Sequence, residues 1–213
     1  MSHELARILR AAARGEFPPP DGETEVIGQP SPRDAGVLAL TARSVVFTDE
    51  DPDWVRAQLA ATPSDRLAAP MNPVFLASLL ARTGRAMNTI DLLNVAWALP
   101  GPPEVRLREI TGDTGHPRVA RALGQRTGVR VWAADGGILV LGRGVAGRWE
   151  CAVEVDEPAR GRGLGPALAR AARQLVPEPA VWAQVSPGNA RSVRTFQAAG
   201  FRAVGSEALF ARV

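Results

Sequence analysis

Three glycines and two arginines stand within six residues, in the stretch RGRGLG that runs from Arg160 to Gly165. Ordering glycine costs more backbone entropy than ordering any other residue, so this density indicates that the backbone itself must approach something closely. The stretch follows the alternating residues VEVDE and precedes the helix-like run PALARAARQLV. A strand that enters a helix through such a turn presents unpaired N–H groups at the positive end of the helix dipole. We therefore expect an anion site here, with a pyrophosphate as the anion.

This turn differs from the two common phosphate-binding loops. It has no GK followed by Ser or Thr, as in a P-loop, and it lacks the GxGxxG spacing of a dinucleotide fold. Gly161, Gly163 and Gly165 would let the backbone approach the anion, while Arg160 and Arg162 would add positive charge. The structural alternative is a glycine helix cap beside a pair of surface arginines.

The distribution of charge also indicates that the second half of the chain is the half that would attract an anion. All 25 basic residues are arginines and 22 residues are acidic, which gives a net charge of +3. Residues 1–100 hold 9 arginines and 12 acidic residues, a net of −3, whereas residues 101–213 hold 16 and 10, a net of +6. The arginines are not interleaved with aromatic residues, so we expect a phosphorylated small molecule and no nucleic acid.

Several classes of protein are disfavoured by the composition. The single cysteine, Cys151, excludes an internal disulfide and a multi-cysteine zinc site, and with only two histidines we expect no metal. The acidic run from Asp49 to Asp53 is interpreted as a solvated loop and helix start, with a metal site as the alternative. No apolar run approaches the length of about 18 residues that a membrane span needs. MSHELARILRAAARGEF also lacks the apolar block of a secretory signal, so we expect a cytoplasmic protein with no membrane partner.

A Pro-rich stretch, ALPGPPEV at 98–105, predicts a boundary near residue 102 between an N-terminal accessory domain, 1–102, and a second domain, 103–213. In the first domain the patterns predict helices at 3–14, 51–61 and 72–84 and an extended segment at 34–48. The second domain is predicted to have the order β α β β β α β α β. Its first strand is expected at 104–110, its first helix is expected to end at Gly128, and a hairpin turn is expected at Asp135–Gly137.

Two motifs at these positions resemble a known family. VEVDEPARGRGLGPAL, residues 153–168, resembles motif A of the GNAT superfamily of acyl-CoA-dependent N-acyltransferases, in which Arg or Gln, two residues, Gly, one residue and Gly or Ala follow one another. Arg160, Gly163 and Gly165 match that pattern. NARSVRTFQAAGF, residues 189–201, resembles the second motif of the family, in which a helix begins near an asparagine and closes on Gly-Phe.

The resemblance covers roughly residues 104–213 and implies both a fold and an activity. The implied fold is α/β (α+β), a mixed twisted sheet flanked by helices, here preceded by a smaller α/β N-terminal domain. The implied activity is transfer of an acetyl group from acetyl-CoA to an amine, so the expected partner is a small-molecule or peptide amine. The implied acetyl-CoA-binding residues are Val153, Val155, Arg160, Gly161, Arg162, Gly163, Leu164, Gly165, Asn189, Ser192 and Phe196.

Within this set the resemblance assigns parts of the cosubstrate to particular residues. The main chain at Val153 and Val155 would bond the pantetheine arm, and the turn would bind the pyrophosphate. Asn189 would bind pantetheine, and Ser192 would lie near the thioester. Asn189 also satisfies the pattern of a helix N-cap, and the two roles are compatible.

The sequence departs from the family at the groups that move protons. The usual acid is a tyrosine of the second motif; Phe196 stands there, and the chain has no tyrosine. A thiol leaves as a stable anion, so Ser192, Cys151 or a water would be enough to supply the proton. Trp149 and Cys151 stand where the family often keeps a base.

Glu150 is our first choice for the base, with Ser192 as the second catalytic residue. The alternative for Glu150 is an exposed ion pair with Arg143 or Arg148. Because the acid and the base are both in question, a non-catalytic acyl-CoA-binding or regulatory module is the alternative function.

The chain also ends early for this family. Twelve residues follow Phe201, where the family usually has two further strands, so we expect an unpaired sheet edge. The N-terminal domain or a symmetric homodimer would cover that edge. The acceptor stays open among antibiotics, polyamines, amino acids and protein N-termini, because acceptor pockets are built from loops.

Overall fold

The computed structural model describes residues 3–110 and 115–212, which fall into two compact units. The first unit is Met1–Leu93 with Val204–Val213, and the second is Asn94–Ala203. These units differ from the predicted domains 1–102 and 103–213 at both ends of the second one. The Pro-rich stretch belongs to the second unit, because Ala98 N–H donates to the Pro179 carbonyl and Leu99 N–H to the Arg173 carbonyl. The last strand belongs to the first unit because it pairs there.

The first unit contains a small mixed sheet. Its strands are β1 (Thr24–Ile27), β2 (Ala35–Leu40), β3 (Arg43–Phe47), β4 (Arg85–Ala86) and β11 (Arg202–Arg212), the last from Val204 on. β1 runs parallel to β3, and β2 and β3 form an antiparallel hairpin. β11 is antiparallel to β2, with Ser206–Phe210 facing Ala39–Ala35. The last strand is therefore paired over these residues with a strand of the N-terminal half, which is one of the two covers expected for its edge.

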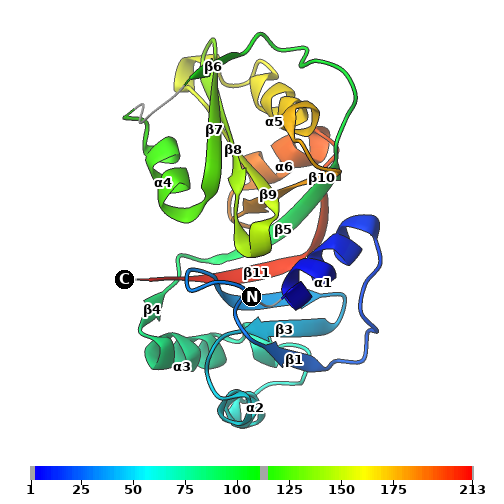
Figure 1. Cartoon of the computed structure of the whole chain (residues 1–213), viewed down its shortest axis with the longest axis vertical. Coiled ribbons are helices and arrows are strands. Elements are labelled where there is room, and N and C mark those ends of the chain that lie inside the picture. The colour runs from blue at the N-terminus through cyan, green and yellow to red at the C-terminus, as the bar shows by residue number, and fades with distance from the viewer. Residues whose placement is uncertain (1–2, 111–114, 213) are drawn as a thin grey trace. The chain divides into compact units, whose positions relative to one another are not determined.

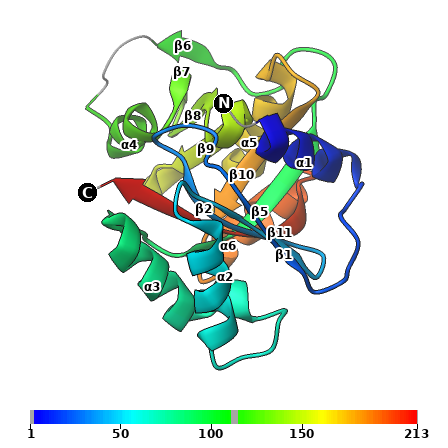
Figure 2. The same cartoon turned by 60° about the horizontal axis from the view of Figure 1, so that its bottom comes forward.

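Three longer helices belong to this unit: α1 (His3–Arg14), α2 (Pro52–Ala61) and α3 (Pro73–Thr83). The 3₁₀ turn η1 (Ala69–Met71) separates the last two, which lie side by side (Figure 2). α2 and α3 bury Val55, Phe75 and Leu79 in one core cluster with sheet residues such as Val37 and Phe210. The three helices predicted in this half are confirmed.

The second unit contains the sheet that carries the glycine turn. Its strand order is β5–β10–β9–β8–β7–β6, of which β5 joins from Asn94 on. The strands are β5 (Ile90–Trp97), β6 (Arg108–Ile110), β7 (Thr127–Ala134), β8 (Gly137–Arg143), β9 (Trp149–Val155) and β10 (Ala180–Val185). β6 to β9 are antiparallel neighbours, whereas β10 is parallel to β9. The predicted strand at 104–110 is regular only at its last three residues.

Helices lie on both faces of this sheet: α4 (Pro117–Gln125) on one, α5 (Leu164–Leu175) and α6 (Ala190–Ala198) on the other (Figure 1). Alternate residues of each strand serve the two faces, so Val140 of β8 packs with α4, while Leu139 and Leu141 pack with α5. Short 3₁₀ turns, η2 (Val145–Gly147) and η3 (Glu157–Ala159), flank β9. The predicted fold class, a mixed sheet flanked by helices, is confirmed.

The ends of these elements follow local chemistry. α4 ends at Gln125, where the sequence predicted an end at Gly128. Gly128 lies instead within β7, at φ 58°, where the register of β7 against β8 shifts between Thr127 and Arg130. The predicted β7–β8 hairpin turn is present, with Gly136 at φ 80°. Over the described ranges 3–110 and 115–212, no helix has both the length and the apolar character required to cross a bilayer.

Candidate functional site

The strands β9 and β10 separate soon after they meet. Within the described residues they share one register pair, Trp182 with Glu150, although both strands continue beyond it. On its other edge β9 pairs with β8 along its whole length, from Trp149 to Val155. The edge of β9 that faces β10 therefore lacks a strand partner from Cys151 onward. Val153 and Val155, predicted to bind through their main chain, lie on this part of β9.

The glycine turn begins where β9 ends. η3 follows directly, and the Nε of Arg160 donates to the Val155 carbonyl at 3.1 Å. Gly161 and Gly163 adopt φ values of 78° and 82°, the left-handed region that favours glycine. A Cβ at either position would meet no protein atom within 4 Å. The backbone of this turn therefore faces open space, and the reason for glycine there is conformation and access rather than crowding.

The first turn of α5 carries the unpaired donors that the sequence predicted. Among the helices whose N-cap the structure describes, α2, α3, α4 and α6 are capped by the side chains of Asp51, Asn72, His116 and Asn189. α5 instead begins at Gly163 with no side-chain cap. Among the described residues, the N–H groups from Gly161 to Gly165 donate to no backbone or side-chain oxygen. They are available to an anion at the positive end of the helix dipole.

Packing around the turn fixes its position. A Cβ on Gly136, in the β7–β8 turn, would lie 2.5 Å from the Ala159 Cβ, and Asp156 N–H donates to the Gly136 carbonyl at 2.9 Å. A Cβ on Gly165 would lie 3.2 Å from Thr195 Cγ2 of α6 and 3.7 Å from Val155 Cγ2. The missing side chains thus allow the hairpin, β9, α5 and α6 to converge on the turn. Leu164, also predicted to bind, is half-buried against the core of this unit.

Asn189 and Ser192 lie at the start of α6. The Oδ1 of the exposed Asn189 accepts from the Ser192 N–H at 3.0 Å, so the N-cap role considered for Asn189 is confirmed. That cap uses only the amide oxygen, so the amide N–H₂ group can still donate a hydrogen bond, which is compatible with binding pantetheine. Ser192 is half-buried. Their roles toward the thioester stay predictions.

Phe196, at the position of the usual acid, is part of the core. Its side chain is 6% exposed, and its ring meets Phe201 edge to face, with the ring centroids 5.0 Å apart. Phe196 therefore closes the core between α6 and the sheet, and a direct contact with the cosubstrate stays a prediction.

Glu150 is the centre of a buried polar cluster and is 3% exposed. Its Oε1 accepts from Arg148 Nε at 2.8 Å, from Gln184 Nε2 at 3.1 Å and from Val145 N–H at 3.3 Å. Its Oε2 accepts from Arg126 Nε at 3.0 Å. We call Arg126, Arg148, Glu150 and Gln184 the Glu150 cluster. Arg148 is one of the two partners considered from the sequence, but the pair is buried rather than exposed, while Arg143 pairs with Glu178 at 2.7 Å.

The charges of this cluster control its titration. Burial raises the pKa of the Glu150 carboxyl, but the charges of Arg148 and Arg126 and the hydrogen bonds from them outweigh burial, so this pKa lies below its ordinary value. A general base works best with a pKa near the operating pH. The assignment of Glu150 as base stays a prediction, and its surroundings favour a structural role. Cys151 is buried beside it, and burial raises the pKa of this thiol to about 12.

Sequence reasoning missed two members of the Glu150 cluster. Arg126 follows α4 and precedes β7, and Gln184 lies on β10, so both are remote from Glu150 along the chain. No motif marks either of them. The one available clue is register: where Trp182 of β10 pairs with Glu150, Gln184 lies two residues further along the same strand and within reach of Glu150.

Comparisons with known proteins find a family match within the second unit. Residues 126–201 match the family model described as "Acetyltransferase (GNAT) family". A GCN5-related N-acetyltransferase structure from Kribbella flavida is 16% identical, with a TM-score of 0.42 over 99% of this chain and 95% of that chain. A GCN5-related N-acetyltransferase from Sphaerobacter thermophilus is 16% identical, with a TM-score of 0.38 over 64% of this chain. The match spans 55% of that chain, about half its length.

A third solved structure is a tandem GNAT protein from the clavulanic acid biosynthesis pathway. It is 14% identical, with a TM-score of 0.38 over 83% of this chain and 78% of that chain. No curated protein matches the sequence. The similarity to this family therefore rests on the match at residues 126–201, which includes β9, the glycine turn and α6.

Proposed function

We propose that this chain catalyses an acyl transfer, because residues 126–201 match the GNAT family of acetyltransferases. In this proposal the chain is an acetyltransferase that moves an acetyl group from acetyl-CoA to an amine, in the cytoplasm, where cells hold their CoA thioesters. The observation that carries the proposal is the uncapped start of α5 at the glycine turn, within the matched segment.

The turn fits a pyrophosphate chemically. The N–H groups from Gly161 to Gly165 are unpaired among the described residues, and the space beside Gly161 and Gly163 is open. Phosphate oxygens are acceptors that such donors satisfy without a side chain. Arg162 is exposed and makes no ion pair within the described ranges, so its guanidinium is available to the same anion. The cosubstrate would thus exchange water at these donors for charge-assisted hydrogen bonds.

The separation of β9 from β10 leaves a strand edge that could bind pantetheine, the arm that links the pyrophosphate of acetyl-CoA to its thioester. Pantetheine carries two amide groups, and amides pair with an unpaired strand edge as another strand would. β9 offers that edge from Cys151 to Val155, directly before the turn. A pyrophosphate at the turn and an arm along β9 would bring the thioester toward the point where the two strands meet.

The transfer depends more on the orientation of the amine and the thioester than on acid–base groups of the protein. An amine must lose a proton as it attacks, the oxyanion needs a donor, and the thiolate must leave. A thiol has an ordinary pKa of about 8.5, so its anion departs near neutral pH with little help. Cys151, with its pKa raised to about 12, is a weaker acid than that thiol and is a poor donor to it. Ser192 or a water is the better source of the proton.

The second candidate function is a non-catalytic acyl-CoA-binding module. Two observations favour it: Phe196 is packed in the core where the family has its acid, and the carboxylate of Glu150 is fully engaged by donors. This candidate shares the cosubstrate site with the first and differs only in turnover.

Binding is tested by calorimetry with CoA on the full chain and on Gly163→Val. A side chain at Gly163 would enter the space assigned to the pyrophosphate, so we expect binding to be lost. Gly101→Val is the matched control, because Gly101 has the same φ of 82° and open surroundings, but it lies in the Pro-rich stretch. Equal CoA affinity in folded Gly163→Val and in the wild type would contradict the assignment of the turn.

Turnover is tested by release of free thiol from acetyl-CoA across a panel of amines. Release that depends on both the amine and an intact Gly163 supports the acetyltransferase. CoA binding without release for any amine in the panel would leave the non-catalytic module as the function.

A further inference from the structure

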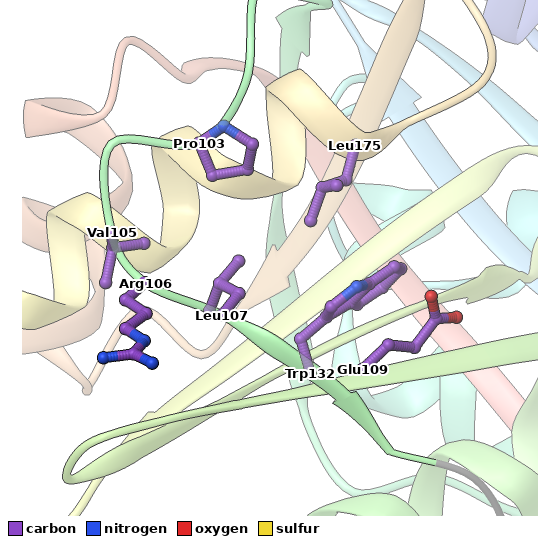
Figure 3. Close-up of a pocket in the computed structure, with 7 residues that line it drawn as sticks. All are labelled: Pro103, Val105, Arg106, Leu107, Glu109, Trp132 and Leu175. Atoms are coloured by element: carbon purple, nitrogen blue, oxygen red, sulfur yellow. The ribbon is translucent and has the colours of Figure 1, made fainter.

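A cavity of about 430 Å³ lies at a distance from the glycine turn, beneath the irregular segment from Pro103 to Leu107, which we call the arch (Figure 3). Pro103, Val105 and Leu107 of the arch face Trp132 of β7 and Leu175 at the end of α5 across this cavity. Arg106 and Glu109 complete the lining. The volume is within the range of about 300–1,000 Å³ that small-molecule sites occupy.

The arch is fastened at both ends and unpaired between them. At one end Gln174 Nε2 donates to the Pro102 carbonyl at 2.9 Å, and Glu104 lies 3.6 Å from Arg170. At the other end β6 pairs with β7 from Arg108 onward. Because both anchors are on the second unit, the cavity is a feature of that unit alone. The arch spans from α5 to β7, with Val105 and Leu107 packed against the core cluster that contains Trp132, and the cavity is open to solvent.

The charges at this cavity leave one cation without a partner. Glu109 is bound by both arms of Arg130, at 2.9 and 3.0 Å, and this hydrogen bonding holds the pKa of Glu109 below its ordinary value. The Glu109 charge is therefore neutralised. Arg106 is exposed and makes no ion pair or hydrogen bond within the described part of the chain. The lining is thus apolar walls with one unpaired positive charge.

The cavity is also distant from the proposed cosubstrate. Leu175 is the last residue of α5, whereas the glycine turn precedes its first residue, Leu164. At a rise of 1.5 Å per residue the two ends of this helix are about 16 Å apart. A ligand in the cavity would therefore bind independently of the pyrophosphate.

We propose that this cavity is a second binding site, and that its ligand is a small carboxylate with an apolar body. The body would pack against Val105, Leu107, Trp132 and Leu175, where burial of apolar surface drives binding. The carboxylate would pair with Arg106, the one lining cation that lacks a partner among the described residues. A cationic ligand would meet Arg106 without an available carboxylate, because Glu109 is held by Arg130.

The test uses three probes that share one apolar body: 4-phenylbutyrate, the neutral 4-phenylbutanol and the cationic 4-phenylbutylamine. Each is titrated into the full chain while NMR follows the indole N–H of Trp132, which Trp132→Phe identifies. We expect 4-phenylbutyrate to shift this resonance at the lowest concentration and the amine at the highest. Arg106→Gln should weaken the acid about two- to fivefold, the range of an exposed charge pair, and leave the alcohol unchanged.

Arg108→Gln is the matched control, because Arg108 is exposed at the start of β6, directly after the arch, but does not line the cavity. Leu107→Trp is the second variant: it should fill the space and abolish binding of both the acid and the alcohol, while CoA affinity reports that the unit is folded. Absence of any shift at Trp132, equal affinities for the acid and the amine, or an equal loss in Arg106→Gln and Arg108→Gln would overturn the proposal.

Discussion

Glu150→Gln is the substitution that best separates a structural from a catalytic role at the site. Glutamine keeps the shape of the side chain but removes the negative charge that the buried guanidinium groups of Arg126 and Arg148 contact; their side chains are 10% and 4% exposed. Removing one partner of a buried ion pair costs about 3–5 kcal/mol, because the remaining charge is uncompensated. Domains are stable by about 5–15 kcal/mol, so we expect a folded variant with a strongly reduced free energy of unfolding.

Glu154→Gln is the matched control. Glu154 lies on the same strand and the same face as Glu150 and pairs with Arg118 at 2.6 Å, but its side chain is 40% exposed. An exposed pair contributes about 0–1 kcal/mol. Urea unfolding of the wild type and both variants, followed by tryptophan fluorescence, should therefore give a large loss for Glu150→Gln and little change for Glu154→Gln.

The dependence on pH gives a second measurement of the same cluster. The pKa of Glu150 in the folded chain lies below its ordinary value of about 4.3. A carboxyl with a lowered folded pKa stabilises the fold fully above its unfolded pKa and loses that contribution as the pH falls toward the folded one. The wild type should therefore lose stability below about pH 4 more steeply than Glu150→Gln, which has no group to protonate there.

One result would refute this reasoning. If Glu150→Gln unfolds with a free energy within about 1 kcal/mol of the wild type, the cluster does not hold the fold as its geometry indicates. If the same variant also releases thiol more slowly and loses the fall in rate that the wild type shows on the acidic side of the pH profile, Glu150 acts as the base after all.

Three further outcomes follow from the surroundings of β9. Gly144→Ala should destabilise the chain by about 1–3 kcal/mol in the same urea assay, because a Cβ there would lie 2.1 Å from the carboxyl carbon of Glu150, and a change below that range would contradict the packing. Cys151 should resist iodoacetamide in the native chain and react only in urea, as mass spectrometry would show, because it is buried with its pKa raised to about 12. Phe196→Tyr should change the rate of thiol release little, since the ring is packed edge to face on Phe201, and a large increase would show that the new hydroxyl reaches sulfur.

Elements whose boundaries depend on local chemistry were predictable from the sequence. α2 begins after Asp51 with Pro52 at its first position, and α3 ends at Gly84 with φ 62°, as the capping patterns indicate. The hairpin between β2 and β3 was missed, because its turn is formed by Thr41 and Ala42 at φ values of 44° and 59°. Neither residue is a usual choice for that conformation, so no residue pattern indicated the turn.

The limits of the two units were not predictable from the same patterns. A run of prolines and glycines marks a place where regular structure stops, and such a run by itself predicts a domain boundary. The chain at 98–102 is instead held on the second unit by Arg173 and Gln174 of α5 and by the Pro179 carbonyl. Pairing of β11 with β2 joins residues far apart in the sequence, and no local propensity encodes such a contact.

In the candidate site, too, the features that depend on backbone conformation were predictable from the sequence, whereas those that depend on contacts between side chains were not. The glycine turn was readable because glycine spacing reports directly on backbone conformation, and Gly161 and Gly163 adopt the φ values that such spacing implies. The state of Glu150 was not readable, because it depends on Arg126 and Gln184, which only the fold brings to the strand. In this chain the parts of the site that would bind through N–H groups and strand edges are thus encoded locally. The charged side chains are set by tertiary contacts, so the identity of the base must come from kinetics on variants of that cluster.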